Sequence, residues 1–255
     1  MLSSLRHQNL VHFVGFCYEN NEMILVNKYE ANGSLDRYIG DPITLTWMQR
    51  LQICVGIARA ISYIHYDEAR DFSIVHRNVR SSKILLDDSW QPKLAGFELS
   101  MRSTKAGRDL YVFAHPCGMK GYVDPKYIES SSVTHKSDVY SFGVVLFEVL
   151  CGRRAFMETE GSGIMLSDLV KSHFENGTLD DMIDQSLRKQ MDQESYKVFS
   201  ETAYCCLKDQ RAQRPHIDQI LIALEKALQL QLKLEQSTVV AEAEVEGTVS
   251  ERWKR

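Results

Sequence analysis

The sequence predicts an α+β fold in which a small strand region precedes a larger helical body. Short apolar blocks run from Leu10 to Cys17 and from Met23 to Asn27, and the polar residues between them are typical of a hairpin. Helical spacing then covers most of the remaining chain. The exception lies between about Ser73 and Pro125, where short apolar blocks alternate with polar turns and predict loops and brief strands.

The helical body is predicted from two regular segments. Apolar residues of the first recur at intervals of four, three, four and three: Trp47, Leu51, Cys54, Ala58 and Ile61. Thr46 and Gln49 are placed as a capping box for this helix. Helical patterning returns from Ser137 and closes with an apolar face at Ile217, Ile220, Leu221, Leu224 and Leu228. Beyond about Leu234 no amphipathic period remains, so we expect a mobile tail over residues 235–255.

Composition narrows the class of protein. The chain has 255 residues and a net charge of −4, so no basic field attracts nucleic acid or anionic lipid. Six cysteines without C-x-x-C spacing are typical of reduced thiols and favour a cytoplasmic location. No signal peptide is predicted, and the most apolar stretch, Val139 to Cys151, is shorter than the roughly 20 residues of a membrane span.

Ordered motifs give this chain a family resemblance. HRNVRSSKILLD at 76–87 resembles the kinase catalytic loop H-R-D-x-K-x-x-N. KLAGFE at 93–98 then stands where D-F-G would lie, and GYVDPK at 121–126 stands in the A-P-E region. With SDVYSFGV at 137–144 and Arg214-Pro215, residues 1–230 resemble the plant receptor-like serine/threonine protein kinases. The resemblance implies a protein-kinase-like fold, mainly the helical C-lobe with a remnant of the N-lobe sheet.

The resemblance places altered residues at the catalytic positions. Asn78 stands where a kinase aspartate accepts the substrate proton, which is worth roughly 10² to 10⁴ in rate. An amide cannot accept that proton, so we interpret Asn78 as a structural loop residue. Arg80 replaces the loop lysine, and its planar fork is not equivalent to an ammonium.

Both positions implied for metal ligands are also altered. Lys83 replaces an asparagine and has no lone pair for a metal, while Gly96 replaces the D-F-G aspartate and has no side chain. We therefore expect no metal site, no Mg²⁺, no bound cofactor and at most residual ATP binding. Two interpretations of Lys83 stay open: a solvent-facing loop residue, or a cation that neutralises a bound phosphate without a divalent ion. Glu98 is interpreted as a solvated loop acid.

Two further changes concern the activation segment, here roughly residues 96–126. Met119 stands where the family has a threonine that organises the substrate platform. Lys126 replaces the glutamate that related kinases pair with the arginine at Arg214. Because removal of one partner of a buried pair costs roughly 3 to 5 kcal/mol, we expect this anchor to be loosened or rewired.

The resemblance also suggests a division of the chain. Residues 1–30 match the end of the regulatory helix plus two strands, 31–234 match the C-lobe, and the tail follows. From this start we expect the Gly-rich loop, the strand lysine and the helix glutamate of the nucleotide site to be missing. The hinge and pocket floor would be formed by Asn27, Lys28, Tyr29 and Leu85.

Residues with a packing role are retained. The family's regulatory spine would be Leu2, Phe13, His76 and Phe97. Asp138 is expected to hold the His76-Arg77 turn through backbone N–H groups.

Arg77 would capture a phosphate on the activation segment. The candidate phosphorylation sites there are Ser100, Ser103 and Thr104.

These residues leave three candidate functions. The first is an inactive kinase domain that acts as a scaffold or allosteric partner of other protein kinases or signalling proteins, with no nucleic-acid partner and no membrane segment in this chain. The second is an active ATP-dependent serine/threonine kinase, and the third is a gene fragment without function. A longer gene product with a membrane span would place the domain at the inner face of the plasma membrane.

Overall fold

The computed structural model describes residues 2–67, 69–104, 111–159 and 162–252. The N-terminal part is a single turn, η1 (Leu2–Ser4), followed by the antiparallel hairpin of β1 (Phe13–Glu19) and β2 (Glu22–Asn27). Asn20 and Asn21 both have positive φ, the conformation that a two-residue hairpin turn requires. The two strands predicted from the apolar blocks are therefore confirmed.

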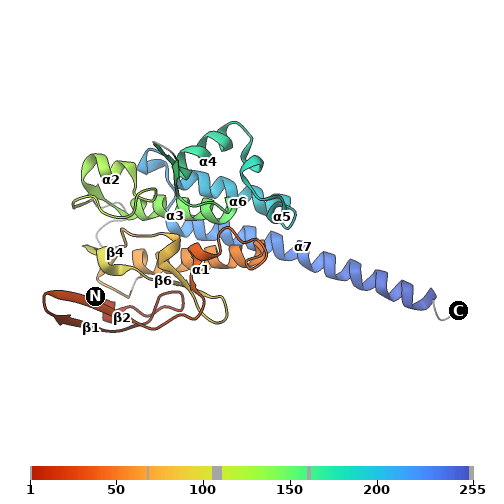
Figure 1. The fold of residues 1–255 in the computed structure, drawn as a ribbon, viewed down its shortest axis with the longest axis horizontal. Helices are drawn as coiled ribbons and strands as arrows, with labels where there is room; N and C mark the ends of the chain where they lie inside the picture. The colour runs from red at the N-terminus through yellow and green to blue at the C-terminus, as the bar shows by residue number, and fades with distance from the viewer. Residues whose placement is uncertain (1, 68, 105–110, 160–161, 253–255) are drawn as a thin grey trace.

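The first long helix, α1 (Trp47–Tyr66), begins at the predicted capping box. The Thr46 N–H donates to Gln49 Oε1 over 3.0 Å, and the Gln49 N–H donates back to Thr46 Oγ1. The apolar side of α1 is buried, and α1 packs alongside α7 (Ile217–Arg252) in the centre of the molecule (Figure 1).

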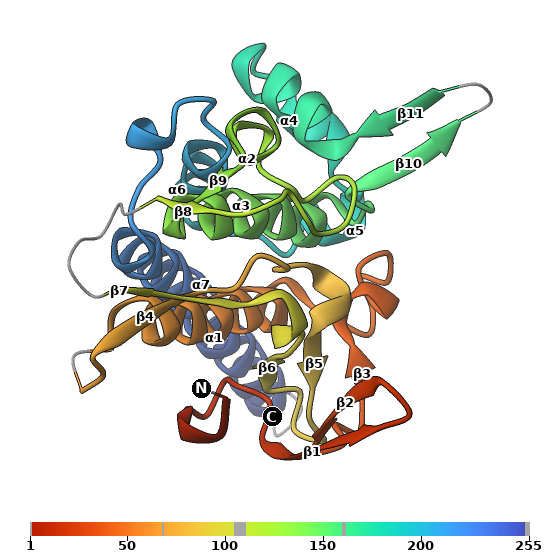
Figure 2. The ribbon, with the colours of Figure 1, turned by 90° about the vertical axis from the view of Figure 1, so that its left-hand side faces the viewer.

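Short strands form the loop-rich region between the two helical segments. β3 (Gly33–Ser34), β5 (Ile84–Leu86) and β6 (Pro92–Leu94) form one sheet, while β4 (Phe72–Val75) pairs with β7 (Met101–Thr104). The single turns here are η2 (Leu35–Arg37), η3 (Ser81–Lys83) and η4 (Phe97–Leu99). These turns and strands place residues 76–98 in one compact group beside α1 (Figure 2).

The helical body surrounds α3 (His135–Cys151), every residue of which is buried. Around it lie β8 (Val112–Phe113), α2 (Pro125–Ser130), β9 (Ser132–Val133), β10 (Phe156–Thr159), β11 (Ser162–Met165), α4 (Leu166–Glu175), η5 (Leu179–Met182), α5 (Gln185–Arg188), α6 (Gln193–Cys206) and η6 (Arg211–Gln213). Small sheets next to a mainly helical body confirm the predicted α+β class.

The tail expected over residues 235–255 is corrected in one respect, because α7 continues to Arg252 and projects from the body (Figure 1). This part of the helix was not predicted, because the sequence beyond Leu234 has no amphipathic period. Glutamate is the commonest residue in 235–252 and has high intrinsic helix propensity, but valine, threonine, serine and glycine in the same stretch do not, so propensity alone does not account for this helix. None of the described helices is long and apolar enough to cross a membrane.

Candidate functional site

A buried carboxylate fixes the backbone of the catalytic-loop region. Asp138, in the first turn of α3, accepts hydrogen bonds from the His76 N–H (2.7 Å) and the Arg77 N–H (2.8 Å). Arg77 has a φ of +67°, an uncommon conformation that these two bonds help to hold. The contact that the resemblance implies for Asp138 is therefore present.

His65 on α1 supplies a third partner to the same carboxylate, with Nε2 2.9 Å from Asp138 Oδ2. Burial lowers the pKa of His65 to about 3, and burial raises the pKa of Asp138. A neutral imidazole that donates to the carboxylate is consistent with both directions. This buried group joins α1, α3 and the catalytic loop, and sequence reasoning did not identify His65.

Asn78 follows directly on this fixed turn. Its N–H donates to His76 Nδ1 over 3.2 Å, and its side chain is half-buried. The carboxamide has no titratable group near neutral pH, so it cannot take up a proton as a general base.

Lys83 and Gly96, the two positions implied for metal ligands, lie against each other. A Cβ added to Gly96 would stand 2.6 Å from Lys83 Cδ and 2.7 Å from Lys83 Cγ. The aliphatic stem of Lys83 thus fills the space that an aspartate side chain would need. The φ of +87° at Gly96 adds a conformation that other residues rarely adopt.

The charge of Lys83 is balanced by Glu98, with Nζ 3.1 Å from Oε1. The Lys83 side chain is 26% exposed, so it is more enclosed than a solvent-facing residue, whereas the Glu98 side chain is 50% exposed and faces solvent. Partial burial opposes ionisation of Glu98, but a backbone hydrogen bond and the ammonium of Lys83 outweigh it, so the pKa of Glu98 lies below its usual value.

This donor set does not fit Mg²⁺. The ion prefers six oxygen ligands in an octahedron, whereas Lys83 offers only donors and Gly96 offers no side chain. Within the described residues no group of three or more histidine, cysteine, aspartate or glutamate side chains could hold a metal ion.

The interlobe region is tightly filled. His76 packs edge-to-face on Phe97 with ring centroids 4.6 Å apart. Leu2, Phe13, Asn27 and Phe97 line a hollow of about 20 Å³, which has room for about one water molecule. The predicted spine residues thus lie together. Of the predicted hinge and floor residues, Asn27 lines this hollow, whereas Lys28, Tyr29 and Leu85 do not.

Arg77 connects the catalytic loop to both ends of the activation segment. Its guanidinium donates to Leu99 O (3.1 Å), to His115 O (3.0 Å) and to the Tyr127 hydroxyl (2.6 Å). The donors expected for a phosphate are therefore engaged by neutral oxygens in this conformation.

The candidate phosphorylation sites differ in access. The Ser100 hydroxyl donates to Phe97 O, and Ser103 is buried in β7. The Thr104 backbone pairs with Phe72 at the end of that strand. Modification of Ser103 would require the β4–β7 pair to open.

Arg80 was predicted to replace the loop lysine, and Met119 to replace a threonine of the substrate platform. Arg80 Nη1 lies 2.9 Å from the Met119 sulfur, which connects the catalytic loop to the segment before α2.

A groove of about 470 Å³ opens beside this segment. It is lined by residues of 116–128, by Tyr140, and by Met165, Ser167 and Asp168 at the start of α4.

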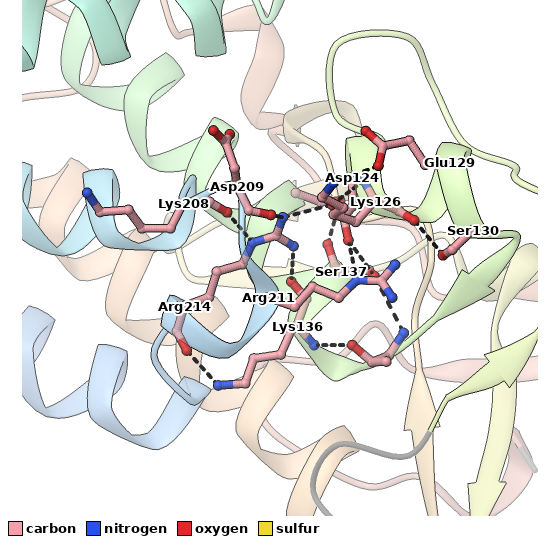
Figure 3. Close-up of polar contacts among 12 residues, drawn as sticks. Asp124, Lys126, Glu129, Ser130, Lys136, Ser137, Lys208, Asp209, Arg211 and Arg214 are labelled. Carbon is pink, nitrogen blue, oxygen red and sulfur yellow. Dashed lines mark hydrogen bonds and ion pairs between the residues drawn. The ribbon is translucent and has the colours of Figure 1, made fainter.

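The anchor predicted to be loosened or rewired is rewired (Figure 3). Arg214 Nη2 donates to Asp124 Oδ1 over 2.8 Å, with both side chains fully buried, and Arg211 Nε binds Asp124 Oδ2 over 3.0 Å. Burial opposes ionisation of Asp124, but Arg214 outweighs it and the pKa of Asp124 lies below its usual value. Lys126 instead pairs with Glu129 on the surface.

Sequence reasoning missed Asp124, although a signal was available. An aspartate immediately before a proline at the start of a helix is a common N-cap, and the Asp124 carboxylate accepts from the Lys126 N–H. The same carboxylate accepts from the Ser137 hydroxyl over 2.8 Å. One acid thus replaces the lost glutamate as the partner of Arg214.

A second buried acid also joins the segment to α3. Glu148 Oε1 accepts from the Tyr122 hydroxyl (2.7 Å) and from the Ala155 N–H (3.0 Å), and Tyr122 contacts Ser81 Oγ over 3.0 Å. Burial raises the pKa of Glu148 to about 7. These contacts connect the catalytic loop, the activation segment and α3.

Comparison with known proteins agrees with this geometry. The family model for the protein kinase domain matches residues 1–223. The chain belongs to the protein kinase family. This kinase domain is 43% identical over 238 residues to the receptor-like protein kinase HERK 1 of Arabidopsis thaliana, and the alignment covers 91% of the chain and 28% of that protein. It is 41% identical over 244 residues to the receptor-like protein kinase FERONIA of the same plant, with 93% and 26% covered.

The kinase domain is therefore of the plant receptor-like type. It spans about a quarter of the length of these curated relatives, between 26% and 28%.

Proposed function

We propose that this kinase domain transfers no phosphate and acts as a binding module for other protein kinases or signalling proteins. One observation carries the proposal: the stem of Lys83 fills the space beside Gly96, and its ammonium is paired with Glu98. Two metal-ligand positions are thus replaced by a lysine and a glycine that fit each other. Restoring either ligand alone would not restore the other.

Loss of the ligand positions matters more than loss of the base. In kinases the metal ions neutralise the charge that develops on the transferred phosphoryl group, and the loop aspartate then accepts the substrate proton. Removal of a general base alone costs roughly 10² to 10⁴ in rate. Without metal ligands, a base at position 78 would have no activated phosphoryl group to serve.

The domain retains what a binding module requires. Asp138, Asp124 and Arg214 hold the catalytic loop and the activation segment in a defined arrangement. A surface supported in this way is preorganised, which lowers the entropic cost of binding. We place the module in the cytoplasm, at the inner face of the plasma membrane where a longer product carries a membrane span, with no nucleic-acid partner.

We also propose that nucleotide binding contributes little to the function of this domain. Lys83 could reach a phosphate only by giving up Glu98, at 3.1 Å. Any residual ATP binding should therefore be weak and independent of Mg²⁺.

Phosphoryl transfer provides the test. The purified chain is incubated with radiolabelled ATP, Mg²⁺ and a basic acceptor protein, next to an Asn78→Ala variant and an active receptor-like kinase domain. We expect the chain and the variant to give the same incorporation as a blank. Incorporation above the blank that disappears in the variant would contradict the proposal.

The binding role is measured separately. Purified kinase domains of the receptor-like group are passed over the immobilised chain, and binding is compared with that of the Arg214→Met variant, in which the activation segment loses its buried anchor. We expect saturable binding to at least one such domain and weaker binding to the variant. Absence of binding to the whole panel would contradict the scaffold role.

A further inference from the structure

The catalytic loop carries two polar side chains whose donors are hardly used inside the chain. Arg80 Nη1 lies 2.9 Å from the Met119 sulfur, and a thioether is only a weak acceptor. Arg80 Nε is buried without a hydrogen-bond partner, and the guanidinium makes no ion pair with the described carboxylates. The Asn78 carboxamide also makes no hydrogen bond within the described part of the chain. Both side chains therefore have donors available for a ligand.

These two side chains lie on the same side of the loop. Val79 between them is fully buried, and Arg80 has an extended backbone, with φ −165° and ψ 158°. Because successive side chains of an extended segment point to opposite sides, Asn78 and Arg80 both point away from the core. The activation segment forms the facing wall, since a Cβ added to Gly118 would stand 3.2 Å from the Arg77 carbonyl oxygen.

The charges around the loop favour an anion. Glu98, the acid that faces the loop, is paired with Lys83 over 3.1 Å. The two acids buried beneath the loop, Asp138 and Glu148, accept hydrogen bonds from the chain itself. At position 78 a neutral amide stands where a kinase has a carboxylate, so the charge that would repel an anion is absent. Among the described residues the positive charge of Arg80 is therefore not balanced by an ion pair.

We propose that Asn78 and Arg80 bind the phosphoserine side chain of a partner protein without a metal ion. The phosphate group carries close to two negative charges and three acceptor oxygens, which suit a guanidinium fork and an amide N–H. In a kinase the loop aspartate meets the hydroxyl that receives the phosphate. A hydroxyl that is already phosphorylated would meet a donor here instead of a like charge.

The surroundings can accept such a side chain with little rearrangement. Met119 is flexible, so its sulfur can leave Arg80 as the phosphate arrives. The groove of about 470 Å³ is lined by Gly118 and Lys120, on either side of Met119, and leaves room for the residues that flank the phosphoserine. Lys83 keeps its ion pair in this arrangement. The inference rests on the binding role proposed above and names the chemistry of the partner.

Peptide binding tests this site. A fluorescent mixture of short peptides with a central phosphoserine and randomised flanks is titrated with the chain, next to mixtures with serine or glutamate at the centre. We expect the phosphoserine mixture to bind at least about tenfold tighter than either control, because a doubly charged group gains charge-assisted hydrogen bonds. Equal binding of the glutamate mixture, or no saturable binding, would overturn the proposal.

Inorganic phosphate distinguishes a phosphorylated protein segment from a free anion. Phosphate should displace the phosphoserine mixture, but only at concentrations at least about tenfold higher than those at which the peptides bind, because it lacks the contacts of the flanking residues. Displacement at equal concentration would assign the site to the free ion and overturn the phosphoserine assignment.

Two variants locate the binding on the loop. Arg80→Met removes the cation, and Asn78→Asp introduces a repelling carboxylate of nearly the same shape, so each should weaken binding of the phosphoserine mixture by about tenfold or more. The matched control is Arg153→Met, which removes an exposed arginine beyond the end of α3. Circular dichroism checks that all three variants are folded. Unchanged binding by Asn78→Asp, or equal weakening by the control, would contradict the site.

This inference and the binding role can fail separately. A receptor-like kinase domain that binds the immobilised chain is treated with phosphatase and measured again. We expect its affinity to fall by at least about tenfold. Equal affinity before and after treatment would overturn the phosphoserine site while the binding role stands. If neither form binds, the binding role is contradicted, and the peptide titration alone decides the site.

Discussion

Two regions of this kinase domain differ in how their side chains are held. At the positions that the kinase resemblance implies for metal ligands, Lys83 packs against Gly96 and pairs with the exposed Glu98. At the anchor of the activation segment, Arg214 pairs with Asp124 rather than with Lys126, and both side chains are fully buried. The first region thus holds a partly exposed ion pair, and the second holds a buried one.

The difference follows from what each region contributes to the free energy of folding. Unpairing the buried Arg214 would leave a charge without solvent or partner, which is strongly destabilising. The Lys83–Glu98 pair is 26% and 50% exposed, so solvent screens it and its residues can vary at little cost. Folding therefore constrains the Arg214–Asp124 anchor strongly and the Lys83–Glu98 ion pair only weakly.

The anchor should show the largest effect. Arg214→Met leaves the buried Asp124 with Arg211 as its one ion-pair partner among the described residues, and we expect a loss of about 3 to 5 kcal/mol in the free energy of unfolding. Urea denaturation measures it, with Lys126→Met as the matched control on the exposed pair with Glu129. A similar loss in both variants would contradict the rewired anchor.

The packing of Lys83 on Gly96 should come next. Gly96→Ala forces a side chain into a left-handed backbone and against the lysine stem, so we expect a loss of about 2 to 4 kcal/mol. The double variant Lys83→Ala/Gly96→Ala has no Cγ or Cδ at position 83 for the new side chain to meet. Gly96→Ala should therefore cost only about 1 to 2 kcal/mol in that background, from the left-handed backbone alone. Strict additivity in this double-mutant cycle would show that the two residues do not fill a shared space.

Much of the fold was predictable from sequence, because apolar periodicity and capping residues report on local structure. The Thr46 capping box and the helix after it are confirmed. The rewired pair was not predictable, because Asp124 and Arg214 are 90 positions apart and motif matching looked only at Lys126. The contact between Lys83 and Gly96 was also missed, since a glycine gives no sign of which side chain fills its space. The helix beyond residue 235 has no apolar face that a periodic pattern could reveal.

The pH dependence of the free energy of unfolding should reveal the raised pKa of Glu148, the second buried acid. The pKa of Glu148 is about 7 in the folded chain and near 4.5 when unfolded, so its contribution to stability is complete below pH 4.5 and is lost as the pH rises through 7. Glu148→Gln keeps an acceptor for Tyr122 but does not titrate. Relative to the parent, this variant should gain about 1.4 kcal/mol per pH unit between these values.

Urea denaturation at pH 4.5, 5.5, 6.5 and 7.5 measures this trend, and the difference between the two proteins removes the contributions of His65, His76 and Asp138. A constant difference between the parent and the variant would show that Glu148 titrates normally.

The exposed pair should show the smallest effect. Glu98→Gln removes the charge that faces Lys83, and we expect a loss of about 0.2 to 1 kcal/mol that shrinks further at high salt. Thermal unfolding at low and high salt measures it. A loss as large as that of Arg214→Met would reverse the comparison between the two regions.

Mg²⁺-dependent nucleotide binding tests the central claim most directly, because that claim is the replacement of both metal ligands. The melting temperature of the chain is measured with ATP alone, with ATP and Mg²⁺, and after chelation, next to an active receptor-like kinase domain. A ligand that binds the native state raises the melting temperature. We predict no increase that depends on Mg²⁺ in this chain. A saturable increase with ATP and Mg²⁺ that chelation abolishes would contradict the account.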